Sequence, residues 1–367
     1  MEMIKFKINL LENRFPVFIG SETLPQLAEA LHLYHFDSRA LLFISPSVNR
    51  LYGPQIQQEL KKWKSHPTRL ICNEGIEVGS WESVCRLLSQ LVKIEIYPEQ
   101  PWIVLGGTQL LNTISFVAPL LRVQIRLIKV PTTLISQSDT AISPWARLQL
   151  GEQGEVLESF HRTNFLWTDL NLLSALPDEY YLAGVLNLIR LASIWERSFF
   201  QFVEQNIRAL LTRSPDVLLQ TLHRSCLLKQ DMLNNVMYQP DQSLPEFGLQ
   251  MFQWWRRRNL HKYRANFAVL VVLDMLWRWL LAAELGILTS GADFRRLREL
   301  LVKINVLSTL DPRVVDVLIE AIASDSGNGL LKGFLPKEIG AYFYMENIDS
   351  KIGQAALAEL KRLIKIV

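Results

Sequence analysis

The chain has 367 residues, 49% of them hydrophobic and 20% charged, which is long and apolar enough for two domains that each bury a core. This composition excludes a disordered chain and a mini-protein held together by disulfides. A net charge of only +3 disfavours a dedicated nucleic-acid binder, and three cysteines and six histidines without metal-ligand spacing favour neither a zinc site nor a redox pair.

The first half of the chain alternates short apolar runs with helical patterns. Residues 1–20 alternate like a strand and lack the basic start, apolar centre and cleavage site of a signal peptide. In chain order, we expect strands at 40–44, 69–72, 102–105 and 126–130, and helices at 54–63 and 81–92. This alternation predicts an α/β domain with a parallel, Rossmann-like sheet and crossover helices.

From about Pro177 onward the strand signal ends and amphipathic patterns follow. They predict helices over 178–204, 215–236, 267–285, 294–304, 312–323 and 352–366. The longest apolar run, 267–283, contains Asp274 and Arg278, which lie one helical turn apart and are able to pair. We interpret this run as a buried helix of a soluble domain rather than a membrane span. The expected organisation is a Rossmann-like α/β domain over 1–170 and an all-α domain over 171–367.

The three cysteines predict the compartment. Cys72, Cys85 and Cys226 cannot all pair, and a chain of this size does not need disulfides to fold. We therefore expect reduced thiols in the core and a cytoplasmic protein.

One strand end resembles a nucleotide-binding turn. The run Leu105-Gly106-Gly107 leads from a predicted strand into a helix, which is where an α/β sheet presents a dinucleotide to a helix N-terminus. The glycines stop at two, however, and Thr108 and Gln109 follow. A tight strand-to-helix turn without a ligand is therefore the favoured interpretation.

A longer motif begins at Val130. Residues 130–140 read Val-Pro-Thr-Thr-Leu-Ile-Ser-Gln-Ser-Asp-Thr and resemble the Val-Pro-Thr-Thr-Leu-Leu-x-Gln-x-Asp-Ser signature of 3-dehydroquinate synthase and the wider sugar-phosphate cyclases. Other segments match that family in order and spacing, at Gly106-Gly107, Ser159-Phe160-His161, Leu176-Pro177, Leu335-Pro336 and Ile339-Gly340. The resemblance implies NAD in the N-terminal domain, zinc or cobalt in the helical domain, and a dimer. It also implies a reaction in which a sugar-phosphate alcohol is oxidised, phosphate is eliminated and a carbocycle is closed.

The metal ligands implied by the resemblance are missing. The family's glutamate falls at Asn187, its first ligand histidine at Leu249 and its last at Phe267, with His261 close to the last position. A leucine and a phenylalanine offer no lone pair to a divalent ion. The resemblance therefore predicts a chain without a metal site.

The positions that the family uses for NAD and substrate also differ. Its glycine loop reads Gly-Gly-Thr-Gln-Leu-Leu-Asn over 106–112, so two side chains fill space that a pyrophosphate would need. Gly79 and Trp145 stand where lysines are expected, and Val123 stands where a phosphate-binding arginine is expected, beside Arg122. We expect no NAD and no metal, and hence no cofactor.

A smaller polar set survives. It consists of Asp139, Arg190 in place of a lysine, and Lys229, which the resemblance places facing the interdomain cleft. In one interpretation the cleft still holds a small phosphate or carboxylate ligand. In the other, which we favour, the charges pair with one another in a disused pocket.

A basic and aromatic cluster, the 253–264 segment, stands where the resembled family carries metal histidines at the rim of the cleft. Its cations are Arg256, Arg257, Arg258, Lys262 and Arg264, interleaved with Trp254, Trp255 and Tyr263. One interpretation is an anion-binding or partner-docking patch, with a protein partner favoured over nucleic acid. The other is a solvated helix end with the tryptophans packed beneath it. The exposure of the two tryptophans distinguishes the two interpretations.

The sequence as a whole predicts a catalytically degenerate protein, a pseudoenzyme, that acts as a binding or subunit-type protein. The expected assembly is a homodimer or a heterodimer with an active relative, without nucleic acid or membrane. The alternative is an enzyme of changed, metal-free chemistry, a lyase, isomerase or cyclase step on a phosphorylated or carboxylated metabolite in the interdomain cleft. Asp139 would then act as acid or base, and Arg190 and Lys229 would bind the anion.

Overall fold

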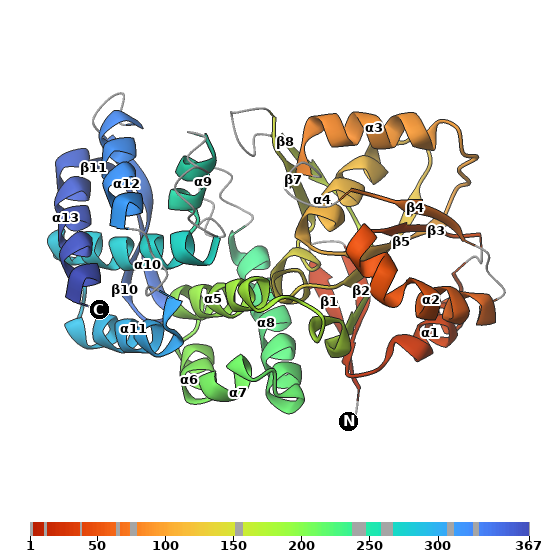
Figure 1. Ribbon diagram of the computed structural model, residues 1–367, viewed down its shortest axis with the longest axis horizontal. Coiled ribbons are helices and arrows are strands. Elements are labelled where there is room, and N and C mark those ends of the chain that lie inside the picture. Colours follow the sequence, from red (N-terminus) through yellow and green to blue (C-terminus); the bar gives the residue numbers. More distant parts are fainter. Residues whose placement is uncertain are drawn as a thin grey trace. The chain divides into compact units, whose positions relative to one another are not determined.

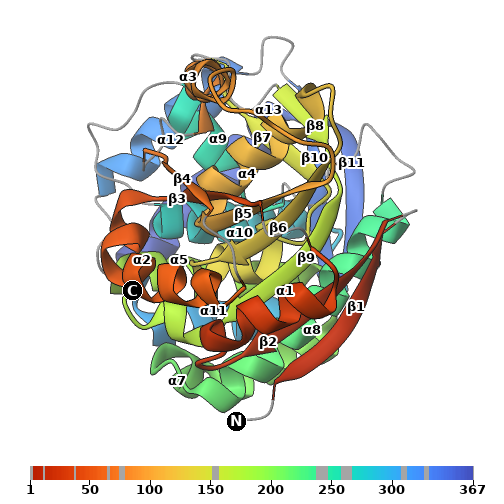
Figure 2. The ribbon, with the colours of Figure 1, turned by 90° about the vertical axis from the view of Figure 1, so that its right-hand side faces the viewer.

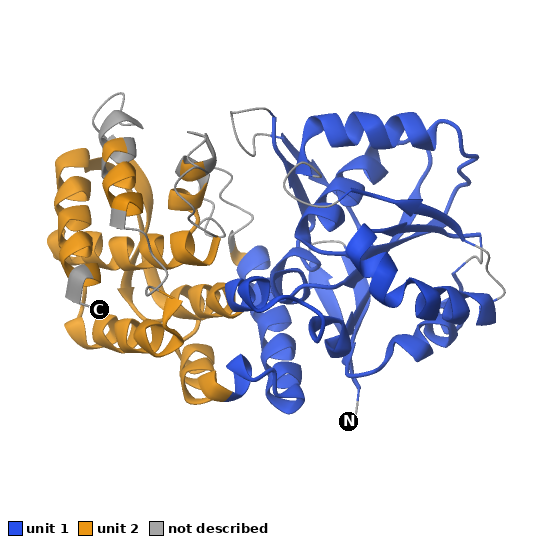
Figure 3. Cartoon of the chain, in the orientation of Figure 1, with its two compact units in different colours: residues 1–184, 209–234 blue, residues 185–208, 235–367 orange. Residues whose placement is uncertain are grey.

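The computed structural model divides into two compact units (Figure 3). The first contains residues 1–184 and 209–234, and the second contains 185–208 and 235–367. Within them the structure describes residues 3–10, 13–36, 39–63, 67–73, 79–150, 157–236, 247–257, 267–306, 312–325 and 330–366.

The first unit is built around a seven-stranded sheet with the order β1-β2-β9-β6-β5-β3-β4 (Figure 2). The strands are β1 (Ile4–Leu10), β2 (Asn13–Gly20), β3 (Leu41–Ile44), β4 (Thr68–Ile71), β5 (Gln100–Gly106), β6 (Ile125–Pro131) and β9 (Thr163–Asp169). Strand β1 pairs antiparallel with β2, and all other neighbours are parallel. The predicted parallel α/β domain is confirmed.

Helices cover both faces of this sheet (Figure 1). They are α1 (Leu27–Leu33), α2 (Pro46–Lys62), α3 (Trp81–Leu91) and α4 (Thr108–Val117). The core under α1 and α2 includes Ile128 and Val130 of β6. Because side chains alternate along a strand, Lys129 points to the opposite face. Helix α2 begins eight residues before the predicted Pro54, since Pro46 occupies the first helical turn and the helix continues through Pro54.

Two short elements follow β6 in the first unit. A π-helical turn over Ser136–Thr140 comes first, and the antiparallel hairpin of β7 (Trp145–Leu148) and β8 (Leu157–Phe160) comes next. The ring of Trp145 lies edge-on to that of Phe160, with centroids 5.2 Å apart.

Helix α8 (Pro215–Val236) contacts the sheet of the first unit. Asn9 in edge strand β1 donates its N–H to Oε1 of Gln230 at 2.7 Å, and its carbonyl accepts from Nδ2 of Asn234 at 3.0 Å. These bonds satisfy backbone groups at an exposed sheet edge. The contacts therefore divide the chain differently from the boundary expected at residue 170, because a helix from late in the sequence closes the edge of the first sheet.

The second unit is predominantly helical, as predicted. Its helices are α5 (Asp178–Trp195), whose first turns belong to the first unit, α6 (Arg197–Gln205), α9 (Gln250–Arg257), α10 (Phe267–Glu284), α11 (Gly291–Ile304), α12 (Pro312–Asp325) and α13 (Ser350–Ile366). The short helix α7 (Ile207–Leu211) begins in this unit and ends in the first. The helix predicted over 178–204 breaks at Glu196, whose backbone is extended. The unit also contains a hairpin, β10 (Leu330–Glu338) and β11 (Ala341–Asp349), so it is not entirely helical. The hairpin packs on α10, a long-range contact that no local sequence pattern predicts.

The structure tests three further sequence predictions. Helix α10 is buried, and Arg278 donates from Nε to Asp274 Oδ1 at 2.8 Å, as the spacing predicts. No helix among the described residues combines the length and apolarity needed to span a bilayer. All three cysteines are free, but only Cys226 is a core thiol, since Cys85 is exposed and Cys72 half-buried.

Candidate functional site

The motif at 130–140 builds a tight turn at the ends of β6 and β9. The Ser136 hydroxyl accepts from the backbone N–H of Thr133 at 3.0 Å. The Gln137 carboxamide donates to the carbonyls of Pro131 at 3.1 Å and Asp169 at 3.0 Å. These bonds tie neighbouring strands together and fix the position of the turn that carries Asp139.

Asp139 forms an ion pair with Lys229 of helix α8. The Lys229 Nζ lies 2.6 Å from Asp139 Oδ1, and the two side chains are 4% and 17% exposed. A second bond, from the Ser225 hydroxyl to the Ser138 carbonyl at 2.9 Å, holds α8 against the same turn. Two of the three surviving polar residues therefore meet as a closed pair in the first unit.

Arg190 lies in the second unit, where its guanidinium is buried beside Asn187. Its Nε and Nη2 donate to Asn187 Oδ1 at 3.1 and 2.9 Å, and its Nη1 donates to the Phe247 carbonyl at 2.6 Å. Gly248 leaves room for the stem, because a Cβ there would lie 2.7 Å from Arg190 Cδ. The arginine thus connects helix α5 to the segment that enters α9.

This arrangement does not fit a divalent metal. The Asn187 oxygen already accepts two N–H groups from a cation, and a guanidinium at that place repels a second cation. Leu249 is half-buried, and the Phe267 ring packs edge-on against Phe252 with centroids 4.9 Å apart. No group of three His, Cys, Asp or Glu residues able to hold a metal exists within the described part of the chain.

The turn after β5 does not fit a dinucleotide either. A Cβ on Gly106 would lie 2.7 Å from Leu110 Cδ2, so the first glycine-loop position is packed by the helix that follows. The Gln109 carboxamide lies against Gly79, where a Cβ would meet its Oε1 at 2.0 Å. The Thr108 hydroxyl bonds that of Thr140 at 3.2 Å. Side chains therefore cover the first turn of α4, where a pyrophosphate needs open backbone N–H groups.

A hollow of about 350 Å³ lies elsewhere in the first unit, lined by Glu22, Tyr52, Asp169 and Asn171 among others. The Asp169 carboxylate accepts backbone N–H groups of Glu22, Leu24 and Asn171, at 2.7 to 3.0 Å. This acid therefore organises two chain turns at the strand ends.

Sequence reasoning missed one polar pair of the first unit, Lys129 and His161. The Lys129 Nζ lies 2.8 Å from His161 Nε2, and both side chains are buried. Burial lowers the pKa of Lys129 to about 7, and burial together with the Lys129 charge lowers the pKa of His161 well below 6.5. The signals in the sequence were a lysine inside an apolar strand and the place of His161 in a segment that matches the resembled family.

The 253–264 segment is only partly described. Trp255 is buried, with 2% exposure, which agrees with a tryptophan packed beneath a helix. The side chains of Trp254, Arg256 and Arg257 lie outside the described residues, as do Arg258, Lys262 and Arg264 altogether. The choice between a docking patch and a solvated helix end stays a prediction.

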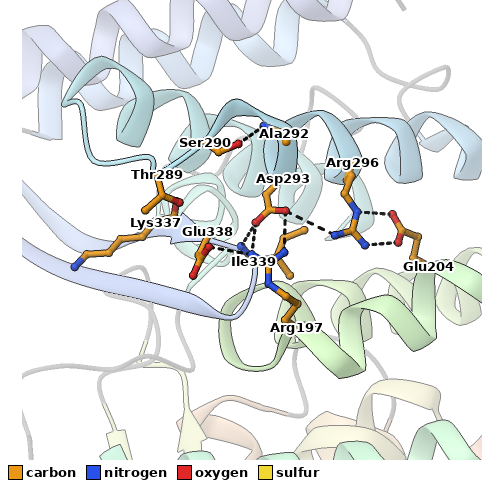
Figure 4. A network of polar contacts seen from close by, with 10 residues as sticks. All are labelled: Arg197, Glu204, Thr289, Ser290, Ala292, Asp293, Arg296, Lys337, Glu338 and Ile339. Carbon is orange, nitrogen blue, oxygen red and sulfur yellow. Dashed lines mark hydrogen bonds and ion pairs between the residues drawn. The ribbon is translucent and has the colours of Figure 1, made fainter.

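The motif at 335–340 is held by a network of ion pairs in the second unit (Figure 4). Arg197 donates to Asp293 at 2.6 and 3.1 Å and to Glu338 at 3.0 Å, and Asp293 also accepts from the Ile339 N–H at 2.9 Å. Burial alone would raise the pKa of Asp293. The bonds from Arg197 and Ile339 and the charges of Arg197 and Arg296 instead hold it below its ordinary value. The network fixes the hairpin turn to helices α6 and α11.

Gly340 closes that turn, and replacing it by alanine is expected to lower the free energy of unfolding by about 1–3 kcal/mol. Its φ is +84°, and a Cβ would lie 2.6 Å from the backbone nitrogen of Arg197, which cannot rotate away. Urea unfolding measures the loss. The matched control is Gly291→Ala, because a Cβ there meets nothing within 4 Å, so the helix should keep or gain stability. Equal losses in both variants would contradict the steric argument.

Comparison with known proteins agrees with this fold. The 3-dehydroquinate synthase N-terminal family matches residues 69–183. The 3-dehydroquinate synthase of Thermodesulfovibrio yellowstonii is 24% identical over 232 residues, which are 63% of this chain and 65% of that enzyme. That of Pelotomaculum thermopropionicum is 25% identical over 226 residues, or 62% of this chain and 61% of the enzyme. The matched region thus spans less than two thirds of these relatives.

Two solved structures show the same fold over nearly the whole chain. The 2-epi-5-epi-valiolone synthase of Streptomyces hygroscopicus subsp. jinggangensis, solved with NAD+ and Zn2+ bound, is 21% identical with a TM-score of 0.82. A 2-deoxy-scyllo-inosose synthase, complexed with carbaglucose-6-phosphate, NAD+ and Co2+, is 17% identical with a TM-score of 0.85. Each comparison covers 97% of this chain and 99% of the other.

The sheet, the helical unit and the turn at 130–140 define a protein with the fold of the sugar-phosphate cyclases. The chain is similar to the 3-dehydroquinate synthases through the family match over residues 69–183 and through its fold.

Proposed function

We propose that this chain is a catalytically degenerate 3-dehydroquinate-synthase-like protein that acts as a binding or subunit-type protein. In this proposal it performs no NAD- and metal-dependent cyclase chemistry. The observation that carries the proposal is the buried contact between Arg190 and Asn187, at 2.9 and 3.1 Å. The Arg190 guanidinium, a cation of the chain itself, lies beside Asn187. Asn187 is the residue that the resemblance aligns with a metal-binding glutamate.

The turn after β5 gives independent support. Gln109 and Thr108 cover the first turn of α4, and the charges of Asp139 and Lys229 are paired. A chain selected to bind a dinucleotide and a sugar phosphate would keep backbone N–H groups and cations accessible.

The proposal predicts that neither a metal nor NAD binds. Purified protein dialysed against excess Zn2+ or Co2+ should retain far less than one ion per chain by elemental analysis. Titration with NAD should give no measurable heat at micromolar protein. An active 3-dehydroquinate synthase treated in parallel serves as the positive control. Stoichiometric metal or tight NAD binding would overturn the proposal.

The subunit role implies a protein partner, and we propose a homodimer or a heterodimer with an active relative in the cytoplasm. The free state of all three cysteines supports a reducing compartment. Light scattering on the purified chain, alone and mixed with an active relative, measures the assembly. A monomer under both conditions would contradict the subunit role.

A metal-free enzyme has less support from the geometry. It needs Arg190 and Lys229 to bind an anionic substrate, yet Arg190 is 1% exposed and Lys229 is 4% exposed. Freeing Arg190 would break its hydrogen bonds to Asn187 and Phe247. Freeing Lys229 would break its ion pair with Asp139.

A further inference from the structure

Lys129 ends in a buried junction of three chain segments. It lies in strand β6, and its Nζ is 3.2 Å from the Ala141 carbonyl, 3.5 Å from the Ser143 carbonyl and 2.8 Å from His161 Nε2. The side chains of Lys129 and His161 are 1% and 3% exposed. The backbone N–H of His161 also donates to the Pro144 carbonyl at 2.9 Å. The pair therefore connects β6, the turn at 141–144 and the turn between β8 and β9.

No acid neutralises Lys129 among the described residues. Strand β5 and helix α4, which pack against β6, contain no charged side chain. The carboxylate of Asp139, in the neighbouring turn, is paired with Lys229 of α8.

The remaining charges on adjacent elements are exposed or engaged elsewhere, and Arg162, in the turn between β8 and β9, is exposed. In the β7–β8 hairpin, Arg147 pairs with Glu158 at 2.6 Å on the solvent side. On β9 the one charged residue, Asp169, accepts backbone N–H groups at the far end of the strand. A charged Lys129 would therefore be buried without a counter-ion, which is strongly unfavourable.

The histidine indicates where the shared proton lies. Its Nδ1 is buried without a hydrogen-bond partner in the described structure. A proton on Nδ1 would leave a buried donor unsatisfied, whereas a bare Nδ1 costs less. With the proton on Nε2, His161 donates to the lone pair of an uncharged Lys129 amine. The two amine hydrogens then donate to Ala141 and Ser143, so every donor is satisfied.

We propose that Lys129 and His161 form a pH-sensitive latch, which holds the turn at 141–144 and the β7–β8 hairpin against strand β6 while Lys129 is uncharged and loosens when Lys129 is protonated. The latch is independent of the proposed function, because none of its residues belongs to the aligned metal or NAD positions.

The direction of the pH effect follows from linkage. The ordinary pKa of a lysine is 10.5, and burial lowers that of Lys129 to about 7 in the folded chain. Between these values the open state binds more protons than the closed state, so closure strengthens as pH rises. Below about pH 7 both states bind the proton, so the closed state then carries the full cost of burying a charged amine.

Hydrogen exchange tests the latch directly in the wild-type chain. Amide protection in β7 and β8, corrected for intrinsic exchange, should be about tenfold higher at about pH 8 than at about pH 6, relative to amides of β5. This measurement needs no variant. A constant ratio of hairpin to β5 protection over this range would overturn the proposal.

A substitution isolates the lysine. In Lys129→Met the pH dependence of hairpin protection should disappear, and the unfolding constant of the wild type relative to this variant should fall about tenfold per pH unit above about pH 7. The matched control is Lys93→Met, an exposed lysine, which should behave as the wild type at every pH. The same pH dependence in Lys129→Met as in the wild type would assign the effect to another group and overturn the latch.

Discussion

Replacing Asp274 by asparagine will lower the free energy of unfolding of the second unit by about 3–5 kcal/mol, because it leaves a buried guanidinium without its counter-ion. Asp274 is fully buried in α10 and accepts from Arg278 Nε at 2.8 Å. It also accepts the backbone N–H groups of Gln250 and Met251, and thereby fixes the first turn of α9. Arg278 in turn donates to the Phe334 carbonyl of β10 at 2.8 Å.

Urea unfolding followed by circular dichroism measures this loss. The matched control is Glu359→Gln, which breaks the exposed ion pair of Glu359 with Arg362 on α13. An exposed pair at this spacing contributes little, so the control should change stability by less than about 1 kcal/mol. Similar losses in both variants would show that burial of the Asp274 pair is not what makes it important.

The Asp274 pair is also an example of what the sequence alone predicts. Its two residues are four apart on an apolar helix, so local spacing brings them together without knowledge of the fold. The parallel strands β3, β4, β5 and β6 and most helices of both units are predicted by the same kind of local periodicity, whereas strand β9 is not. The motif at 130–140 adds the family's fold through its resemblance to the 3-dehydroquinate synthase signature, and its turn is built by short-range bonds such as Thr133 to Ser136.

Contacts between distant segments are what the sequence does not predict. The pairing of Asp139 with Lys229 is expected only from the family resemblance and not from local periodicity, because it depends on α8 returning to the first sheet. Lys129 meets His161 only because β9 lies beside β6. The β10–β11 hairpin is stabilised by packing on α10 and by the Arg197 network, and its residues carry no strong strand pattern. Pairing partners of this kind are set by topology, which periodicity does not encode.

The candidate site contains both kinds of feature, one that the sequence predicts and one that it does not. The alignment of Asn187 with a metal-binding glutamate predicts that a ligand is missing, but it does not predict what replaces it. That Arg190 bonds Asn187 follows from their spacing of one helical turn. That the same guanidinium reaches the Phe247 carbonyl, 57 residues away, is a property of the fold.

The hydrogen bonds of Arg190 give this position a structural role. Removing the Arg190 side chain will therefore lower the stability of the second unit. Arg190→Met should lower the free energy of unfolding of the second unit by about 3 kcal/mol, since the Phe247 carbonyl loses a charged donor and Asn187 Oδ1 loses two N–H groups. Chemical unfolding of the variant measures the loss.

Arg190→Met and Asn187→Leu should each destabilise the chain, and the double variant should lose much less than the sum, because the two single changes break the same bonds. Neither change should create a metal site, since Leu249 and Phe267 still offer no ligand atoms. Co2+ titration followed by visible absorption checks this second point. Additive losses in the cycle would mean that Arg190 and Asn187 act separately, and stoichiometric Co2+ binding by Arg190→Met would mean that the arginine only blocks a site that is otherwise intact.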